Sequence, residues 1–332
     1  MNQGPRWEPV EQPEPQPSGP GRMTLREVLD VGTRILRRHW VVLLLTALLF
    51  SGPGALLSSA TALRFTEVFI DLFPEFEEGV LVDTDRFFTT AELERAIDAL
   101  LPFLGASLLA GVLGSIGALA FSATVAEDYH ARQARVGTVV RASLERAPSA
   151  LVFMLVTGLL IVGLLVLGLL GMSVATIILP AGGGGGGPGV FLALIIGVAL
   201  VVALVYLTMR WAPAYPVMVE ERAGWREALR RSWHLSADNV LRILMVSLLI
   251  ALITAIVSSV LGAIFEALLS GFLAPALGLD EMVASTIALA LASVVVAPAM
   301  AVYTAVLYFD LRARRDLPEP PVSVTPPYDP YR

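Results

Sequence analysis

Six long apolar stretches, separated by shorter polar segments, dominate the pattern of hydrophobic and polar positions along the 332-residue chain. A transmembrane helix needs about 20 predominantly apolar residues. Stretches that meet this length lie at about 40–63, 99–125, 151–179, 190–209, 241–265 and 282–309. We therefore predict an all-α integral membrane protein with six transmembrane helices.

A glycine segment divides the third apolar stretch from the fourth. Residues 182–187 are six consecutive glycines, followed by Pro188, and the interior of a helix does not tolerate such a run. We expect a turn here that joins two spans. Residues 172–180, just before it, either continue the third span or bend along the membrane surface.

The arginines lie mainly on one side of the predicted spans. If the amino terminus is inside the cell, the cytoplasmic segments are 1–39, 126–150, 210–242 and 310–332. These segments hold six, four, six and four of the 23 basic residues, all of which are Arg, and the external segments hold three. Cytoplasmic loops carry an excess of basic residues. We therefore predict a multi-pass protein of the plasma membrane with both termini in the cytoplasm.

The amino-acid composition argues against several classes of function. Hydrophobic residues make up 56% of the chain and charged residues 16%, against about 25% charged in an average soluble domain. The 29 acidic residues outnumber the basic ones and give a net charge of −6, so we expect no nucleic-acid partner. Cysteine is absent, which excludes disulfides and thiolate metal sites. The three histidines lie far apart, and we predict neither a metal nor a cofactor.

The two ends of the chain have a different composition from the membrane region at 23–316. Residues 1–22 and 317–332 are rich in proline and charge and poor in large aliphatic residues, which is typical of disorder. The first of these segments has no apolar core of the kind that a signal peptide needs. We therefore expect the first span to direct membrane insertion.

The largest external segment, residues 64–98, is acidic and contains phenylalanines at helical spacing. These are Phe65, Phe69, Phe73 and Phe76. The spacing predicts a helix that lies on the outer membrane surface, and residues 266–277 predict a second one. Calcium binding is the alternative for the acidic residues, but the fixed ligand spacing of a calcium-binding loop is missing.

A short amphipathic segment precedes each odd-numbered span. These segments lie at 24–40, before span three from Gly137, and before span five from Gly224, and each pairs apolar positions with Arg on another face. Each segment together with the two spans that follow it forms a unit of the same orientation. We predict three parallel repeats of an amphipathic helix plus a helical hairpin.

The segment around the fourth span and the third amphipathic helix is the candidate for binding an anionic group. Pro213, Pro216 and Pro298 should kink or break their helices and open a concavity on the cytoplasmic side. Arg favours phosphate through bidentate contacts, and Trp anchors at the membrane interface. The candidate residues are Arg210, Trp211, Trp225, Arg226, Arg230, Arg231 and Trp233.

Three parts of the chain also resemble a known group of proteins. They are TLREVLDVGTRILRRHW, MRWAPAYPVMVEERAGWREALRRSWHLSADNVLR and APAMAVYTAVLYFDLRARRD. They resemble actinobacterial membrane proteins of unknown function, which are similar to the membrane domain of some bacterial glycerophosphodiester phosphodiesterases. The resemblance implies a membrane domain without a mechanism. Phosphodiesterase activity is not expected, because no hydrophilic segment has the ~250 residues of a catalytic barrel.

Two classes of function stay open. In the first, the protein is not an enzyme and binds anionic membrane lipids, or a membrane-protein partner, through its Arg-bearing amphipathic helices. In the second, it is a transporter or permeation protein that works through the kinked fourth and sixth spans, with hydroxyl side chains as a polar lining. An intramembrane enzyme ranks third, because the spans contain no evident pair of nucleophile and base. The sequence does not fix the oligomeric state.

Overall fold

The computed structural model describes residues 23–72, 89–178, 187–278 and 280–316, and all regular elements in these ranges are helices. Six of the helices are long and apolar enough to cross a membrane. The chain is therefore a multi-pass membrane protein with six candidate spans. The predicted terminal segments 1–22 and 317–332 lie outside the described residues, as do Phe73, Phe76 and most of the glycine turn.

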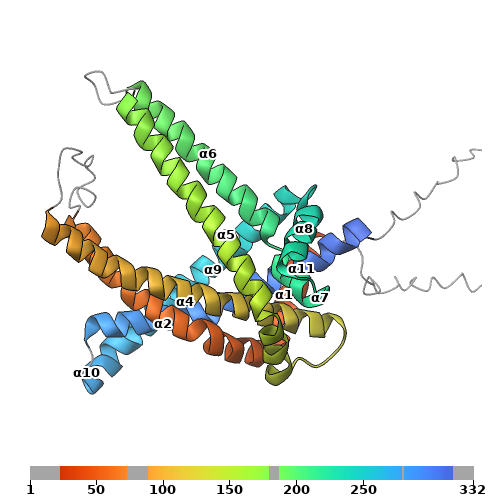
Figure 1. Ribbon diagram of the computed structural model, residues 1–332. Coiled ribbons are helices and arrows are strands. Elements are labelled where there is room, and N and C mark those ends of the chain that lie inside the picture. Colours follow the sequence, from red (N-terminus) through yellow and green to blue (C-terminus); the bar gives the residue numbers. More distant parts are fainter. Residues whose placement is uncertain (1–22, 73–88, 179–186, 279, 317–332) are drawn as a thin grey trace, which may run out of the picture.

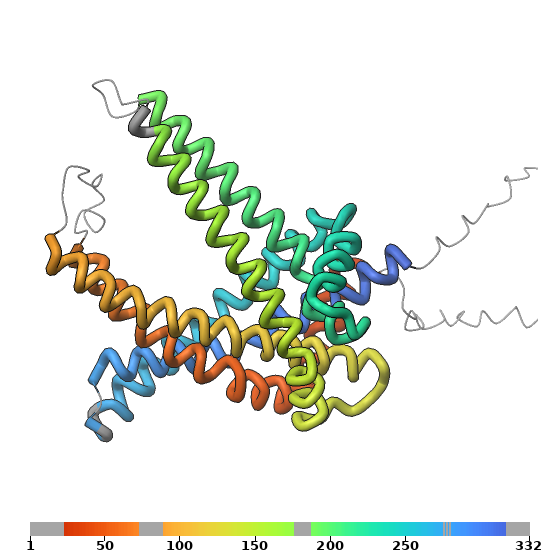
Figure 2. The backbone as a smooth tube through the Cα atoms, in the orientation of Figure 1, coloured from red at the N-terminus to blue at the C-terminus, as the bar shows by residue number. Residues whose placement is uncertain are grey.

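The six long helices form three hairpins (Figure 1). Their bounds are α2 Trp40–Leu72 with α4 Thr90–Tyr129, α5 Val136–Ile178 with α6 Pro188–Trp211, and α9 Val240–Leu268 with α11 Glu281–Asp316. The hairpins meet at one end and diverge toward their loops (Figure 2). Both α5 and α6 expose most of their large aliphatic side chains, as expected of surfaces that face lipid.

Short helices cover the end where the hairpins meet. These are α1 Leu25–Arg38, α7 Ala214–Glu220 and α8 Trp225–Ser236. Helix α1 begins with a capping box, in which the Thr24 hydroxyl accepts from the Glu27 amide and the Glu27 carboxylate accepts from the Thr24 amide. We call this end the basic end, because most of the described arginines lie here.

Helix α11 forms the centre of the molecule. It packs against α9, α2, α1, α4, α7 and α8. Residues 305–311 in its carboxy-terminal half are all buried, with Tyr308 and Leu311 at 0% exposure. Helix α2 packs closely on α4, and a side chain at Gly54 would lie 2.9 Å from the Cα of Ala110. Small residues allow such close packing of helices in membranes.

Several helices extend beyond the predicted spans. Helix α2 extends to Leu72, α4 begins at Thr90, α5 begins at Val136 and α11 extends to Asp316. Apolar length defines the part of a helix that lipid can surround, but a helix continues beyond it until a residue breaks the backbone pattern. Residues 172–178 continue α5. Of the two predicted paths for residues 172–180, the described part therefore continues the third span.

The short elements differ from the prediction in two ways. The amphipathic segment from Gly137 is the first part of α5 rather than a separate helix, and Pro148 lies inside that helix. Phe65 and Phe69 continue α2 instead of forming a separate surface helix. Residues 266–277 are helical, as predicted, but they comprise the end of α9, a π-helix at Leu269–Leu273 and α10 Ala274–Leu277.

Candidate functional site: the basic end of the helix bundle

A buried carboxylate joins three parts of the chain at the basic end. Asp310 of α11 is 0% exposed, and its oxygens accept from Arg242 Nε at 2.9 Å, from Arg314 Nε at 3.0 and 3.1 Å, and from the Met23 amide at 2.6 Å. Both guanidinium groups also donate to the Met23 carbonyl, at 2.6 and 2.7 Å. This network attaches the segment before α1 to α9 and α11.

A second group of charges lies where α7 ends. Glu220 accepts from Arg312 at 3.2 Å and bonds to His130 at 3.0 Å. Glu221 accepts from Arg231 at 3.1 Å and from the Tyr308 hydroxyl at 2.9 Å. These contacts connect α4, α7, α8 and α11. Charge-assisted hydrogen bonds of this kind are stronger than neutral ones.

A third group of charged residues lies where α1 meets α2. Asp128 near the end of α4 accepts from Arg38 at 3.0 Å and bonds to His39 Nε2 at 2.8 Å. Two of the three histidines therefore contact carboxylates that hold helices together. Among the described residues, no group of three or more His, Cys, Asp or Glu could hold a metal ion.

Arg210 is the most buried of the four arginines among the seven candidate residues. It is 9% exposed, donates to the Tyr206 hydroxyl at 2.7 and 3.0 Å and to the Trp233 carbonyl at 2.9 Å, and lies 4.6 Å from the Trp233 ring centre. Its own carbonyl accepts from Ser232 and Ser236. Arg210 thus attaches α8 to the end of α6 instead of facing an open concavity.

The other candidate residues have different environments. Trp211 is buried, and Trp225 is partly buried with the Arg226 guanidinium 5.0 Å from its ring. Arg226 and Arg230 are exposed. Burial lowers the pKa of the Arg231 guanidinium, but hydrogen bonds to Asp316 and Glu221 outweigh it, so this pKa lies above its ordinary value. Arg231 therefore stays charged and paired.

The basic end thus contains two groups of arginines. We call four of them the paired arginines: Arg231, Arg242 and Arg312, which bond to carboxylates on other helices, and Arg314, which binds Asp310 on its own helix. Arg38 and Arg315 also bond to carboxylates, those of Asp128 and Asp238. The outer arginines are those of the amphipathic helices α1 and α8 that are exposed and have no carboxylate partner among the described residues; they are Arg34, Arg37, Arg226 and Arg230. The sequence prediction placed the paired Arg231 in one site with the outer Arg226 and Arg230, because it missed the acidic partners Glu221 and Asp316. The position of these acidic residues next to arginines in the sequence was the signal that could have indicated the ion pairs.

A helix break, one of the two predicted effects of proline, occurs at Pro213. Helix α6 stops at Trp211 and α7 begins at Ala214, with Pro213 between them. Pro298 does not break α11, which continues through it from Glu281 to Asp316. Membrane helices tolerate proline when neighbouring groups satisfy the freed backbone.

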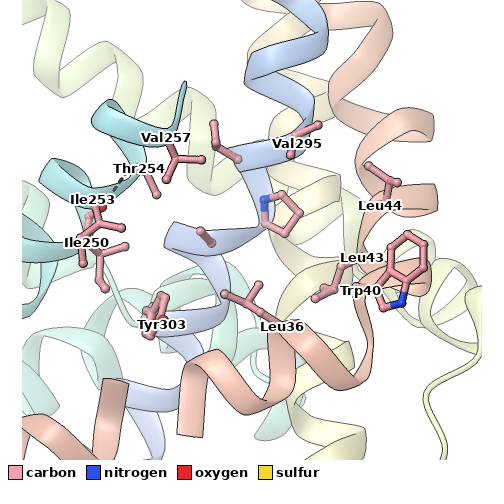
Figure 3. Close-up of a pocket in the computed structure, with 13 residues that line it drawn as sticks. Leu36, Trp40, Leu43, Leu44, Ile250, Ile253, Thr254, Val257, Val295 and Tyr303 are labelled. Carbon is pink, nitrogen blue, oxygen red and sulfur yellow. Dashed lines mark hydrogen bonds between the residues drawn. The ribbon is translucent and has the colours of Figure 1, made fainter. Parts of the chain in front are cut away.

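An apolar groove of about 520 Å³ lies between α2 and α9, with α11 at its base (Figure 3). Trp40, Leu43 and Leu44 line one side and Ile250, Ile253 and Val257 the other, and Tyr303 and Leu36 lie at one edge. A basic hollow on α1 is lined by Asp30, Thr33, Arg34, Arg37 and Arg38. The Thr33 and Tyr303 hydroxyls bond at 2.8 Å, so the hollow and the groove are neighbours.

Comparison with known proteins gives one match. Residues 190–321 match the family model described as the membrane domain of glycerophosphoryl diester phosphodiesterase. No curated protein and no solved structure matches the chain. The matched residues include α6 to α11, and with them the paired arginines and Asp310. The carboxy-terminal part of this multi-pass membrane protein is therefore similar to that membrane domain.

Proposed function

We propose that the protein is a non-enzymatic component of the plasma membrane whose basic end binds the anionic headgroups of lipids in the cytoplasmic leaflet. The observation that carries the proposal is the division of the arginines. The paired arginines have their charge balanced within the protein, whereas the outer arginines present theirs to the surroundings.

The outer arginines lie on two amphipathic helices. Arg34 and Arg37 belong to α1, and Arg226 and Arg230 to α8. Each Arg near an anionic membrane surface contributes about 1 kcal/mol of attraction. Trp40 and Trp233, which are 61% and 40% exposed, lie near these arginines in the chain and suit the interface. Two such helices at one end of the bundle therefore form a lipid-binding surface.

The orientation of the protein is part of this proposal. The excess of arginine at the basic end supports a cytoplasmic location for that end and for both termini. The three hairpins run in the same direction from the basic end, and separate amphipathic helices precede two of them. These features support the arrangement of three parallel repeats, in which the amphipathic part of the second repeat has fused with its span.

The structure of the spans supports the alternative function, transport or permeation, less well than it supports lipid binding. Six hydroxyl side chains of α9 and α11, including Ser258, were candidates for a polar lining. Five of them bond to carbonyls one turn earlier in their own helices; these are Thr254, Ser259, Ser285, Thr286 and Ser293. Such bonds satisfy the hydroxyl locally and leave little polarity for a translocated solute. A membrane-protein partner at the basic end is the competing outcome of the test below.

Native mass spectrometry of the full chain, released from native-lipid nanodiscs, tests the proposal. We expect wild-type protein to retain anionic phospholipid, and Arg34→Gln/Arg37→Gln/Arg226→Gln/Arg230→Gln to lose it. The matched control is Arg64→Gln/Arg95→Gln, which removes charge from the far end of α2 and α4. Equal retention by wild type and the fourfold variant contradicts lipid binding. Copurification of a protein that the fourfold variant loses favours the partner instead.

A further inference from the structure

We propose that the groove between α2 and α9 and the basic hollow on α1 together form one site for a single anionic phospholipid. The groove holds an acyl chain, and Arg34 and Arg37 hold the phosphate. This inference rests on the proposed function and makes it specific. It assigns the acyl chain of one lipid to the groove and the phosphate of the same lipid to the hollow.

The groove fits a hydrocarbon chain. Its volume of about 520 Å³ lies within the range of about 300–1,000 Å³ usual for ligand pockets. Side chains with polar atoms are rare in its lining: they are Trp40, Thr254 and Tyr303. The Thr254 hydroxyl already bonds to the Ile250 carbonyl at 2.8 Å. Pro298 and Ala299 line the groove on the side of α11.

The hollow next to the groove fits a phosphate. It contains three arginines and one aspartate, so its lining has a net positive charge. Arg38 is held by Asp128 at 3.0 Å, and Asp30 faces Arg26 at 4.0 Å. Arg34 and Arg37 have no carboxylate partner among the residues that the structure describes. A guanidinium group that is not paired with a carboxylate can make bidentate hydrogen bonds to phosphate oxygens.

The boundary between the two parts matches the membrane interface. Tyr303 lines the groove, and its hydroxyl bonds to Thr33, which lines the hollow. Trp40, at the start of α2, also lines the groove. Tyr and Trp concentrate at the level of lipid headgroups. A phospholipid with its phosphate above this level and its acyl chain below it would contact both surfaces at once.

The basic surface of α8 provides an internal comparison. Arg226 and Arg230 are exposed as well, but the groove and the hollow described above are lined by residues of α1, α2, α9 and α11. We therefore expect α8 to attract anionic lipids in general, and the α1 site to retain one of them after the others have been removed.

Groove-filling variants of the full chain test this site. Ala299→Phe fills the groove from its base, and Val257→Phe fills it from the exposed side of α9 if the first variant fails to fold. Ala199→Phe is the matched control, because Ala199 is an exposed residue of α6. Purified protein is stripped in detergent and titrated with phosphatidylglycerol, with phosphatidylcholine of matched acyl chains, and with inorganic phosphate, and bound ligand is counted by native mass spectrometry.

We expect one phosphatidylglycerol to bind wild type and the control tightly. Affinity should fall about tenfold or more in Arg34→Gln/Arg37→Gln, since each arginine contributes about 1 kcal/mol. A similar fall is expected in either groove variant, with Arg226→Gln/Arg230→Gln close to wild type. Phosphatidylcholine and inorganic phosphate should bind at least tenfold more weakly.

The outcomes separate this inference from the proposed function. If the groove variants bind like wild type while Arg34→Gln/Arg37→Gln does not, the acyl site is wrong and headgroup binding stands. If inorganic phosphate binds as well as the lipid, the groove again plays no part and the site is a phosphate site. If phosphatidylcholine binds as well as phosphatidylglycerol, or if no arginine variant changes affinity, the phosphate assignment at α1 is overturned.

Discussion

The paired and the outer arginines at the basic end are the same residue type on neighbouring helices, yet their surroundings are opposite. Arg242 and Arg314 share the fully buried Asp310, whereas Arg34 and Arg37 are exposed without a carboxylate partner among the described residues. A buried charge must be balanced inside the protein, because its desolvation is costly. An exposed arginine is hydrated and stays available to a ligand. The paired group therefore stabilises the fold, and the outer group is the one to test for binding.

The largest effect should come from the buried carboxylate. Asp310→Asn leaves Arg242 and Arg314 without a counter-charge, and we expect the free energy of unfolding to fall by about 3 kcal/mol. Thermal unfolding in detergent micelles measures the change. Asp30→Asn on the exposed side of α1 is the control and should stay close to wild type. An Asp310→Asn protein as stable as the control would show that the network has no structural role.

A smaller effect is expected at the hydroxyl that supports Glu221. Tyr308→Phe removes a 2.9 Å hydrogen bond to a carboxylate and should cost about 2 kcal/mol, since bonds to charged groups contribute about 1.5–3 kcal/mol. The same unfolding assay applies. Tyr303→Phe, which loses a bond to the exposed Thr33, is the matched control. The comparison fails if both substitutions cost the same.

Packing of α1 on α11 gives the third prediction. A Cβ at Gly32 would lie 2.2 Å from Cε1 of Tyr303, so Gly32→Ala must displace that ring. We expect a loss of about 1 kcal/mol. At Gly137 no atom lies within 4 Å of the added carbon, and Gly137→Ala should be neutral or slightly stabilising because alanine favours helix. Equal effects at both glycines would contradict the close contact.

The smallest effects compare arginines within one helix. Arg231→Gln loses Glu221 and Asp316 and should lower the free energy of unfolding by about 1 kcal/mol. Arg226→Gln/Arg230→Gln removes exposed charges and should change it by less than about 0.5 kcal/mol. Chemical denaturation in mixed micelles resolves differences of this size. A larger loss in the double variant than in Arg231→Gln would reverse the assignment of the two groups.

Sequence reasoning was most successful for the long helices. Each of the six predicted spans corresponds to a long apolar helix, because the absence of water forces a membrane-spanning segment to satisfy its own backbone. It also predicted the amphipathic helix before the first span, where Thr24 and Glu27 form a capping box. These features depend on residues within a few turns of one another.

The surroundings of the candidate residues were predicted only in part. The sequence placed Arg210 and Trp233 together, but it assigned both to a concavity that faces the cytoplasm. In the structure the Arg210 guanidinium lies against the Trp233 ring and attaches α8 to α6. Arg231 was assigned to the same surface, although Glu221 and Asp316 hold it. Distinguishing a paired from an unpaired arginine requires knowledge of which acidic residue faces it.

The sequence alone determined the membrane class of the protein, its six spans and the concentration of arginine at one end, because hydropathy and charge act through solvent and need no contact between distant residues. Only the tertiary structure decided which arginines are free. Met23, Arg242 and Asp310 are far apart in the chain and meet within hydrogen-bonding distance. Such contacts depend on how the helices pack, which no local pattern specifies.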